Sequence, residues 1–296
     1  MYVPIAFVAV ILVWSTTPLG VKWSAEGITP FAGAFFRIFI AAMVAWVVCK
    51  AMRLPILWHK KALLVYAAAN IGWVVGLLCV YNAATMLSSG MISVLFGSSP
   101  IVSGLLARYL LDEPPFSLVQ WAGLLIGVMG LSVIFEAEFQ LPGANLKGLL
   151  FVAVGVLCFC LSGVLIKRID AGLHPISQTA GTLLTAAPLY ALMLAFAGGD
   201  LLSTETVTAR AVGAIIYLAL FGSLLGFFSY FYILQKLPPS TVALTTLVTP
   251  VIALMLGALL NNEVASESLL LGASCIVAGL MFYLMGPKLM AGLLRA

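Results

Sequence analysis

Ten long apolar stretches separated by short polar joints fill almost the whole of this 296-residue chain. A helix needs about 20 apolar residues to cross the hydrocarbon core of a bilayer. Only helices and closed barrels satisfy their own backbone in lipid, and apolar runs without alternation favour helices. The sequence therefore predicts an all-α integral membrane protein with ten transmembrane helices. The expected spans are roughly 3–21, 31–49, 62–84, 90–107, 116–135, 148–166, 175–198, 211–235, 241–260 and 268–286.

The shortage of charge excludes most other classes of protein. Asp, Glu, Lys and Arg make up 8% of the chain and apolar residues 63%, whereas a soluble domain carries about a quarter charged residues. So few charges cannot cover a globule in water, so we expect membrane lipid around the protein. The basic residues are scattered in short groups rather than gathered on one face, which argues against a nucleic-acid partner.

The five cysteines give no sign of a disulfide framework or a metal site. They all lie in apolar stretches, and their number is odd. Cys158 and Cys160 are two residues apart on an expected helix, without a nearby His, so packing explains them better than metal binding. We expect no metal and no cofactor. The first apolar run lacks a basic n-region and a cleavage site, so we expect it to stay as a helix.

Lys and Arg are distributed unequally between the two sides of the expected bundle. Ten of them lie on the side of the N-terminus, three lie on the other side, and Arg37 lies within a span. Because cytoplasmic loops carry an excess of Lys and Arg, both termini are predicted to be cytoplasmic.

The two halves of the sequence match each other. Pro100 meets Pro250 at an offset of 150 residues, and Lys22 meets Lys167 at an offset of 145. The other matched pairs are Gly72 with Gly222, Gly76 with Gly226, Tyr81 with Phe231, Glu113 with Glu263, Trp14 with Phe159, Gly27 with Gly172, and Pro30 with Pro175. Each half holds five expected spans, so the second half must enter the membrane from the opposite side. The sequence thus predicts two inverted repeats, residues 1–145 and 146–296.

Inverted repeats are typical of transporters, which bind their solute near the midplane between two pseudo-symmetric halves. The alternative is a gene duplication that merely enlarged the bundle. An enzyme would need a catalytic constellation, and the sequence contains no paired His and Glu at metalloprotease spacing, no intramembrane aspartate pair and no phosphate loop. We therefore expect a transporter and not an enzyme, with a passive scaffold as the other alternative.

A set of short motifs recurs in order in both halves. They are residues 81–84, 99–100 and 111–114, then 231–232, 249–250 and 262–263, together with 14–16 and 36–37. Each motif alone is weak, but their order and spacing resemble the drug/metabolite transporter superfamily, and within it the EamA-type exporters. The resemblance covers nearly the whole chain. Within the family, the sequence looks closest to the YddG-like exporters of aromatic amino acids.

The resemblance implies a basket of ten helices around a central cavity lined by helices 1, 3, 4, 6, 8 and 9. It also implies a bacterial inner (plasma) membrane protein that exports small organic solutes by alternating access. Aromatic or neutral amino acids are the expected solutes, and other metabolites or drugs are the alternative. We expect a monomer, because one chain already supplies both halves of a pathway.

Polar and aromatic residues recur at three- and four-residue spacing in six of the expected spans, as the lining of a pathway should. Aromatic faces with neutral hydrogen-bonding groups suit a zwitterionic solute with an apolar or aromatic side chain. Packing between helices is the alternative for each of them. The expected cavity residues are Trp14, Thr17, Asn70, Trp73, Tyr81, Phe96, Ser99, Phe159, Ser162, Phe228, Tyr232 and Thr246.

Backbone-shaping residues occur in matched pairs. Pro100 and Pro250 each remove a backbone hydrogen bond near the middle of a span, so we predict hinges there, with static kinks as the alternative. Small residues four apart let helices approach closely. The residues predicted to serve this packing are Gly72, Gly76, Gly222 and Gly226.

Few titratable groups lie within the spans. For Arg37 we expect an anchoring role at the external end, with Glu26 as a possible partner, and contact with a substrate carboxylate as the alternative. Asp and Glu all fall at or near the ends of spans, which favours a facilitator over a proton- or sodium-coupled carrier. His59 and His174 lie at helix ends, where a solvated or capping role is expected.

Overall fold

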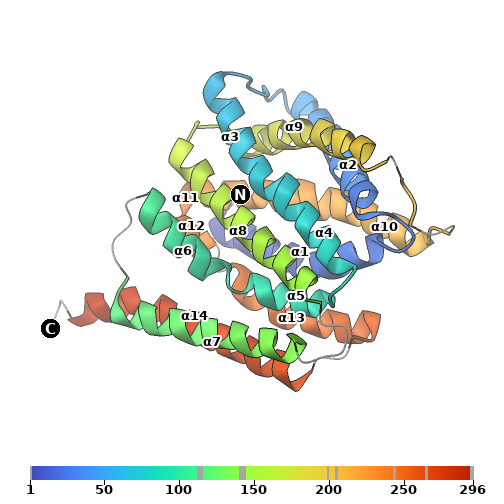
Figure 1. Ribbon diagram of the computed structural model, residues 1–296. Helices are drawn as coiled ribbons and strands as arrows, with labels where there is room; N and C mark the ends of the chain where they lie inside the picture. Colours follow the sequence, from blue (N-terminus) through green and yellow to red (C-terminus); the bar gives the residue numbers. More distant parts are fainter. Residues whose placement is uncertain are drawn as a thin grey trace.

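The computed structural model describes residues 2–111, 116–139, 145–198, 200–203, 206–242, 245–263 and 266–293. Within these ranges the regular secondary structure is helical, apart from one isolated antiparallel β-bridge between Ile28 and Leu202. The helices pack as one bundle, drawn in Figure 1. Glu113 and most of the motif at residues 111–114 lie outside the described residues.

The helices of the first half begin and end close to the expected spans. Thr29 caps one of them by accepting a hydrogen bond from the backbone N–H of Ala32, and Pro30 follows at its first position. The elements are α1 Val3–Ser24, α2 Pro30–Ala51, α3 Lys60–Asn70, η1 Ile71–Gly76, α4 Leu77–Ala84, α5 Ser89–Phe96, α6 Ser99–Leu110 and α7 Leu118–Phe139.

The second half repeats this order of elements. Thr208 accepts a hydrogen bond from the backbone N–H of Ala211 and so caps α10. The elements are α8 Leu146–Ile169, α9 Pro175–Phe196, α10 Ala209–Tyr217, η2 Leu218–Leu225, α11 Gly226–Lys236, α12 Pro239–Val242, α13 Thr245–Asn261 and α14 Glu267–Leu293.

Seven helical segments of the described chain are long and apolar enough to cross a membrane. They are Val3–Ser24, Pro30–Ala51, Lys60–Ala84, Ser89–Leu110, Leu146–Ile169, Pro175–Phe196 and Ala209–Lys236. Shorter apolar stretches lie in α7, α13 and α14. The protein is thus a multi-pass helical membrane protein, and the count of ten spans stays a prediction.

Two segments of π-helix interrupt the long helices at corresponding places in the two halves. η1 lies between α3 and α4, and η2 lies between α10 and α11. Apolar periodicity predicted continuous regular helices here, and a π-helix leaves no separate signal in such a pattern. Because a π-helix takes more residues per turn, it rotates every side chain that follows it around the helix axis. Such interruptions often lie at functional sites.

Residues that match between the halves also share local structure. Gly27 and Gly172 both adopt a positive φ, of 78° and 62°, which favours glycine. Lys22 donates from Nζ to the carbonyl of Leu87, beyond the end of α4. In the same manner, Lys167 donates to the carbonyl of Leu234 near the end of α11, at the same N–O distance of 3.0 Å. The two lysines therefore make equivalent contacts at helix C-termini.

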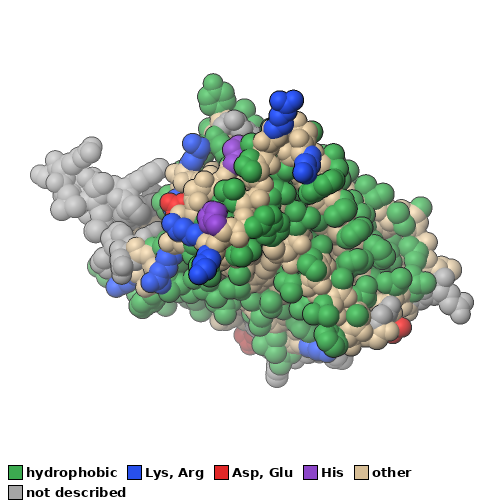
Figure 2. Space-filling view, turned by 90° about the horizontal axis from the view of Figure 1, so that it is seen from above, with side chains coloured by type: hydrophobic (Ala, Val, Ile, Leu, Met, Phe, Trp, Pro, Cys, Tyr) green, Lys and Arg blue, Asp and Glu red, His purple; other side chains and the backbone are tan. Residues whose placement is uncertain are grey.

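The helices α7 and α14 lie side by side along one edge of the bundle, away from α3 and α9 (Figure 1). Gly123 of α7 faces Gly279 of α14, and Gly130 faces Gly272, so small residues let the two helices approach closely. Figure 2 shows a broad band of hydrophobic side chains, with Lys, Arg and His side chains gathered mainly at one end. This surface suits a lipid environment with basic residues at one membrane face.

Candidate substrate cavity

A cavity of about 120 Å³ lies within the bundle, between the two halves of the chain. Its wall comes from α1, η1, α4, α5, α6, α8, α11, α12 and α13, and in addition from α2 through Arg37. Expected cavity residues on this wall are Trp14, Thr17, Trp73, Phe96, Ser99, Phe159 and Thr246. The wall is completed by Pro18, Arg37, Leu77, Val80, Ile92, Ser93, Ser103, Cys160, Gly163, Tyr230, Pro239, Val242 and Thr249.

Aromatic side chains from both halves meet on this wall, around Trp73. Its ring centroid lies 4.7 Å from that of Phe159, in an edge-to-face arrangement, and 6.1 Å from that of Trp14. Tyr230 lies 5.3 Å from Trp14, and Phe96 lies 5.6 Å from Phe159. We call Trp14, Trp73, Phe96, Phe159 and Tyr230 the aromatic cluster. Aromatic walls of this kind hold flat apolar groups in preferred edge-to-face and offset geometries.

Hydroxyl groups supply the neutral polar part of the wall. Thr17 donates from Oγ1 to the carbonyl of Val13 at 2.8 Å, and Ser99 donates from Oγ to the carbonyl of Phe96 at 2.6 Å. A hydroxyl whose proton is engaged with its own helix still has lone pairs to offer. These groups can therefore accept hydrogen bonds from a bound solute.

Five expected cavity residues do not line the cavity. Ser162 donates from Oγ to the carbonyl of Ala69 at 3.2 Å, between α8 and α3. Asn70 donates from Nδ2 to Oγ1 of Thr185 at 2.9 Å, and Tyr81 is fully buried with its hydroxyl 3.5 Å from the carbonyl of Gly33. These contacts join helices. The two remaining residues, Phe228 and Tyr232, pack against each other with ring centroids 6.4 Å apart.

Other residues of the same helices lie on the wall in place of Tyr81 and Tyr232. After η1, the residues that reach the cavity are Leu77 and Val80 rather than Tyr81, and after η2 it is Tyr230 rather than Tyr232. Leu77 and Val80 follow Trp73 by four and seven residues and so share its helical face. Tyr230 is the aromatic residue of the wall that the sequence pattern did not indicate.

The four packing glycines lie in close contact with neighbouring side chains. A Cβ atom added to Gly72 would lie 3.1 Å from Cβ of Ser162, and one added to Gly76 would lie 3.2 Å from Cβ of Cys158, both on α8. In η2, a Cβ on Gly222 would lie 3.0 Å from Nη2 of Arg37. At Gly226, which begins α11, it would lie 3.1 Å from Nε1 of Trp14.

The two expected hinge prolines lie in different helical settings. α5 ends at Phe96 and α6 begins at Ser99, so Pro100 occupies the first turn of α6, where its missing N–H breaks no helical hydrogen bond. Pro250 lies inside α13. A Cβ placed on Gly97, in the break between α5 and α6, would lie 3.5 Å from Cγ of Pro250. The break in one half therefore packs against the proline of the other.

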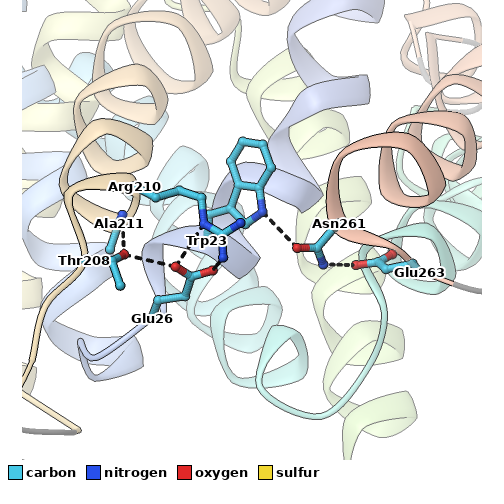
Figure 3. A network of polar contacts seen from close by, with 7 residues as sticks. All are labelled: Trp23, Glu26, Thr208, Arg210, Ala211, Asn261 and Glu263. Carbon is cyan, nitrogen blue, oxygen red and sulfur yellow. Dashed lines mark hydrogen bonds and ion pairs between the residues drawn. The ribbon is translucent and has the colours of Figure 1, made fainter.

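A network of polar contacts crosses one end of the bundle, where α1 ends (Figure 3). Trp23 of α1 donates from Nε1 to Oδ1 of Asn261 at 3.0 Å, and Asn261 donates from Nδ2 to Oε1 of Glu263 at 2.8 Å. The guanidinium of Arg210 lies 5.4 Å from the ring centroid of Trp23 and pairs with Glu26. The expected pairing of Glu26 with Arg37 is therefore wrong.

Glu263 joins this network to the first half of the chain. Its Oε2 accepts from Oγ of Ser89 at 2.8 Å and from the backbone N–H of Gly90 at 3.3 Å, at the start of α5. Burial alone would raise the pKa of the Glu263 carboxyl, but these hydrogen bonds, with that from Asn261, lower the pKa below its ordinary value of 4.5. The carboxylate thus ties α13 to α5 in its charged form.

The two histidines act as helix caps, as expected. Nδ1 of His59 accepts from the backbone N–H of Ala62, and Nδ1 of His174 accepts from that of Ile176, each at 3.3 Å. Among the described residues, no three His, Cys, Asp or Glu side chains come together as metal ligands would.

The fold and cavity define a multi-pass membrane protein with an aromatic-walled site between its two halves. A family model described as the EamA-like transporter family matches residues 1–136 and 146–285. The chain belongs to this family of membrane transporters and is not an enzyme.

Relatives agree with this assignment, and a solved structure shares the fold. The chain is 26% identical over 273 residues to an uncharacterized transporter of Archaeoglobus fulgidus, covering 90% of this chain and 93% of the relative. It is 27% identical over 301 residues to the uncharacterized inner membrane transporter YedA of Escherichia coli K12, covering 96% and 91%. One protein of known crystal structure shares the fold, with a TM-score of 0.73 and 19% identity, covering 97% of this chain and 98% of the other.

Proposed function

We propose that this protein exports a small zwitterionic solute with an apolar or aromatic side chain, in the first place an aromatic or neutral amino acid. The observation that carries the proposal is the aromatic cluster, in which rings from both halves face one cavity. Hydroxyl groups such as those of Thr17 and Ser99 add neutral acceptors to the same wall. An apolar side chain would pack on the rings, and an ammonium group would donate to the hydroxyl oxygens.

The mode of transport in this proposal is alternating access by two inverted five-helix repeats, residues 1–145 and 146–296. In its support, the family model matches the chain in two stretches of similar length, and the two halves contain equivalent π-helices and lysine contacts. The contact of Gly97 with Pro250 joins the two predicted hinge regions. The repeats would rock about the cavity, and a monomer would suffice.

The orientation follows the distribution of basic residues. Both termini would lie in the cytoplasm of a bacterial cell, with the chain in the inner membrane. The network of Trp23, Asn261 and Glu263 would then close the external end. The cavity wall reaches Pro239 and Val242, near the opposite end of the bundle. The conformation described would therefore receive solute from the cytoplasm and release it after the external network opens.

Facilitated diffusion down the solute gradient is the coupling mode that we propose. The cavity wall contains no Asp, Glu or His among the described residues, and these are the side chains that carry protons in coupled carriers. Uptake that depends on an imposed proton gradient would contradict this part of the proposal.

Efflux from liposomes containing the purified protein tests the proposed solute. Tryptophan, phenylalanine, leucine and glutamate, each radiolabelled, would be loaded and their release followed with and without protein. We expect saturable release of tryptophan and phenylalanine, weaker release of leucine, and none of glutamate, because the wall offers one aromatic cluster and no pocket for a second carboxylate. Release of none of them would direct the search to other metabolites or drugs, the second candidate class.

A further inference from the structure

Arg37 is the one charged side chain of the described chain that is buried, with 1% of its surface exposed. Its Nε donates to Oγ of Ser223 in η2 at 2.9 Å. Its Nη1 is also buried, and no residue that the structure describes accepts a hydrogen bond from it. Leaving a donor of a buried charged group unsatisfied is costly, so the guanidinium is expected to have an acceptor in the working protein.

Within the part of the chain that the structure describes, no carboxylate pairs with this guanidinium. Glu26, the acid expected to pair with it, is held by Arg210 and Thr208. Glu263 is held by Ser89, Gly90 and Asn261 at the end of the bundle. Arg37 nevertheless lies on the cavity wall. Its missing acceptor can therefore come from a molecule in the cavity.

A second unsatisfied donor lies on the same wall. Trp73 is buried, with 3% of its surface exposed, and its indole Nε1 has no acceptor among the described residues. Its ring belongs to the aromatic cluster. The cavity wall thus contains two buried N–H donors that have no acceptor among the described residues, and one of them is charged. The same wall offers an aromatic surface on which an apolar ring could pack.

We infer that Arg37 binds the carboxylate of the transported solute, and that Trp73 adds an N–H donor and a ring surface beside it. The inference rests on the proposed transport function and deepens it. A guanidinium is suited to a carboxylate, because its planar N–H groups match the two oxygens and each hydrogen bond is charge-assisted. Ser223 holds the guanidinium from behind by accepting a hydrogen bond from Nε.

The site therefore recognises its solute by the carboxylate group. The cavity wall places a cation for the carboxylate but no acidic side chain for an ammonium group. The carboxylate is therefore required, and the ammonium is accepted by neutral hydroxyls without being required. The solute class is an organic monocarboxylate with an apolar or aromatic body, with or without an α-amino group.

Competition among four matched compounds tests on the wild-type protein whether the solute needs a carboxylate. The compounds are phenylalanine, 3-phenylpropionate, which lacks the amine, phenethylamine, which lacks the carboxylate, and 3-phenylpropanamide, in which a neutral amide replaces the acid. Each would compete with labelled phenylalanine for exchange in liposomes, and binding to protein in detergent would be followed by tryptophan fluorescence. The acids should bind roughly 10-fold to 100-fold more tightly than the amine and the amide. Equal or tighter binding of the amine would overturn the inference.

Variants separate solute binding from a purely structural role. Arg37→Gln should bring the ratio of acid to amide affinity close to one. If Arg37 had a purely structural role, the substitution would instead weaken the binding of both compounds equally. Arg37→Lys should keep a reduced preference for the acid, because it retains the charge without the planar fork. Arg168→Gln makes the same change at an exposed site at the end of α8 and should leave the ratio unchanged.

The outcomes distinguish the inference from the function on which it rests. If wild-type protein binds the acids preferentially but exchanges no solute, the transport proposal fails while the carboxylate site stands. If exchange of phenylalanine occurs and the amine competes as well as the acid, the carboxylate site fails while transport stands. If Arg37→Gln does not fold, the ratio of acid to amide affinity, measured on wild-type protein and on Arg37→Lys, still tests the carboxylate site.

Discussion

Tyr190 of α9 donates its hydroxyl hydrogen to the backbone carbonyls of Trp73 and Val74, at 3.1 and 3.0 Å. Both carbonyls lie in η1, and Tyr190 is completely buried. A side chain from the other half of the chain thus adds a hydrogen-bond donor to the backbone of η1. The position of Trp73 in the cavity wall is therefore fixed from behind by α9, as that of Arg37 is fixed by η2.

Removing that hydroxyl should loosen η1. In Tyr190→Phe the two carbonyls lose the hydroxyl donor, which should lower the stability of the folded protein by about 1 kcal/mol and weaken solute binding at Trp73. Thermal unfolding in detergent and solute titration measure the two effects. Tyr109→Phe, at an exposed position of α6, is the matched control. An unchanged melting temperature for Tyr190→Phe would show that the contact contributes nothing.

The two tyrosines of α11 offer a direct comparison of the predicted and observed cavity faces. Tyr230 lies on the wall 5.3 Å from Trp14, whereas Tyr232 lies beside Phe228 and Lys236, away from the wall. Tyr230→Ala should therefore weaken the affinity for an aromatic solute by roughly 3-fold to 10-fold, and Tyr232→Ala should leave it nearly unchanged. The measurement is the concentration of solute at half-maximal exchange. A larger effect at Tyr232 would favour the face predicted from sequence.

Replacing glycine by alanine should have opposite effects on stability at a tightly packed position and at an open one. Gly72→Ala should destabilise the protein by about 1 kcal/mol or more, because its Cβ would be 3.1 Å from Cβ of Ser162, tighter than ordinary packing. Gly213→Ala, in α10, meets no atom within 4 Å and should stabilise the helix by up to about 1 kcal/mol. Thermal unfolding of both variants in the same detergent tests the pair. A stabilising Gly72→Ala would mean that the contact between η1 and α8 is loose.

Glu263 should make the closed end of the bundle sensitive to acid. Its folded-state pKa is lowered, so its contribution to stability is complete above the ordinary pKa of 4.5 and is lost as the pH falls below that value through the lower folded-state pKa. The melting temperature of wild-type protein should therefore drop in this range. Glu263→Gln should melt lower at neutral pH and show a smaller drop. The exposed Asp200→Asn serves as control, and an identical pH profile for Glu263→Gln would contradict this role.

Apolar run length predicted the positions of the helices well, because lipid imposes one strong requirement on every span. Finer features depended on packing that a single sequence does not encode locally. Tyr81 and Tyr232 were predicted on the wall, whereas Leu77 and Tyr230 of the same helices line it. On α1, Trp14 and Thr17 line the cavity as expected, whereas on α8 Phe159 lines it and Ser162 contacts α3 instead.

Hydrogen-bond and ion-pair partners that are distant along the chain could not be predicted from the sequence either. Glu26 is near Arg37 along the chain but pairs with Arg210, because the start of α10 lies beside the loop that follows α1. Ser223, the residue that does hold Arg37, is 186 positions away. Only the packing of α2 against η2 brings them together.

The central claim is that solute crosses the membrane through this cavity by alternating access, and trans-stimulated counterflow tests it most directly. Liposomes loaded with unlabelled phenylalanine should take up labelled phenylalanine transiently above the outside concentration, which a channel cannot do. Thr246→Trp, which fills the cavity at α13, should abolish this uptake while the protein remains folded. Equal counterflow by Thr246→Trp and wild-type protein would show that the solute passes elsewhere, and uptake without overshoot would contradict the carrier mechanism.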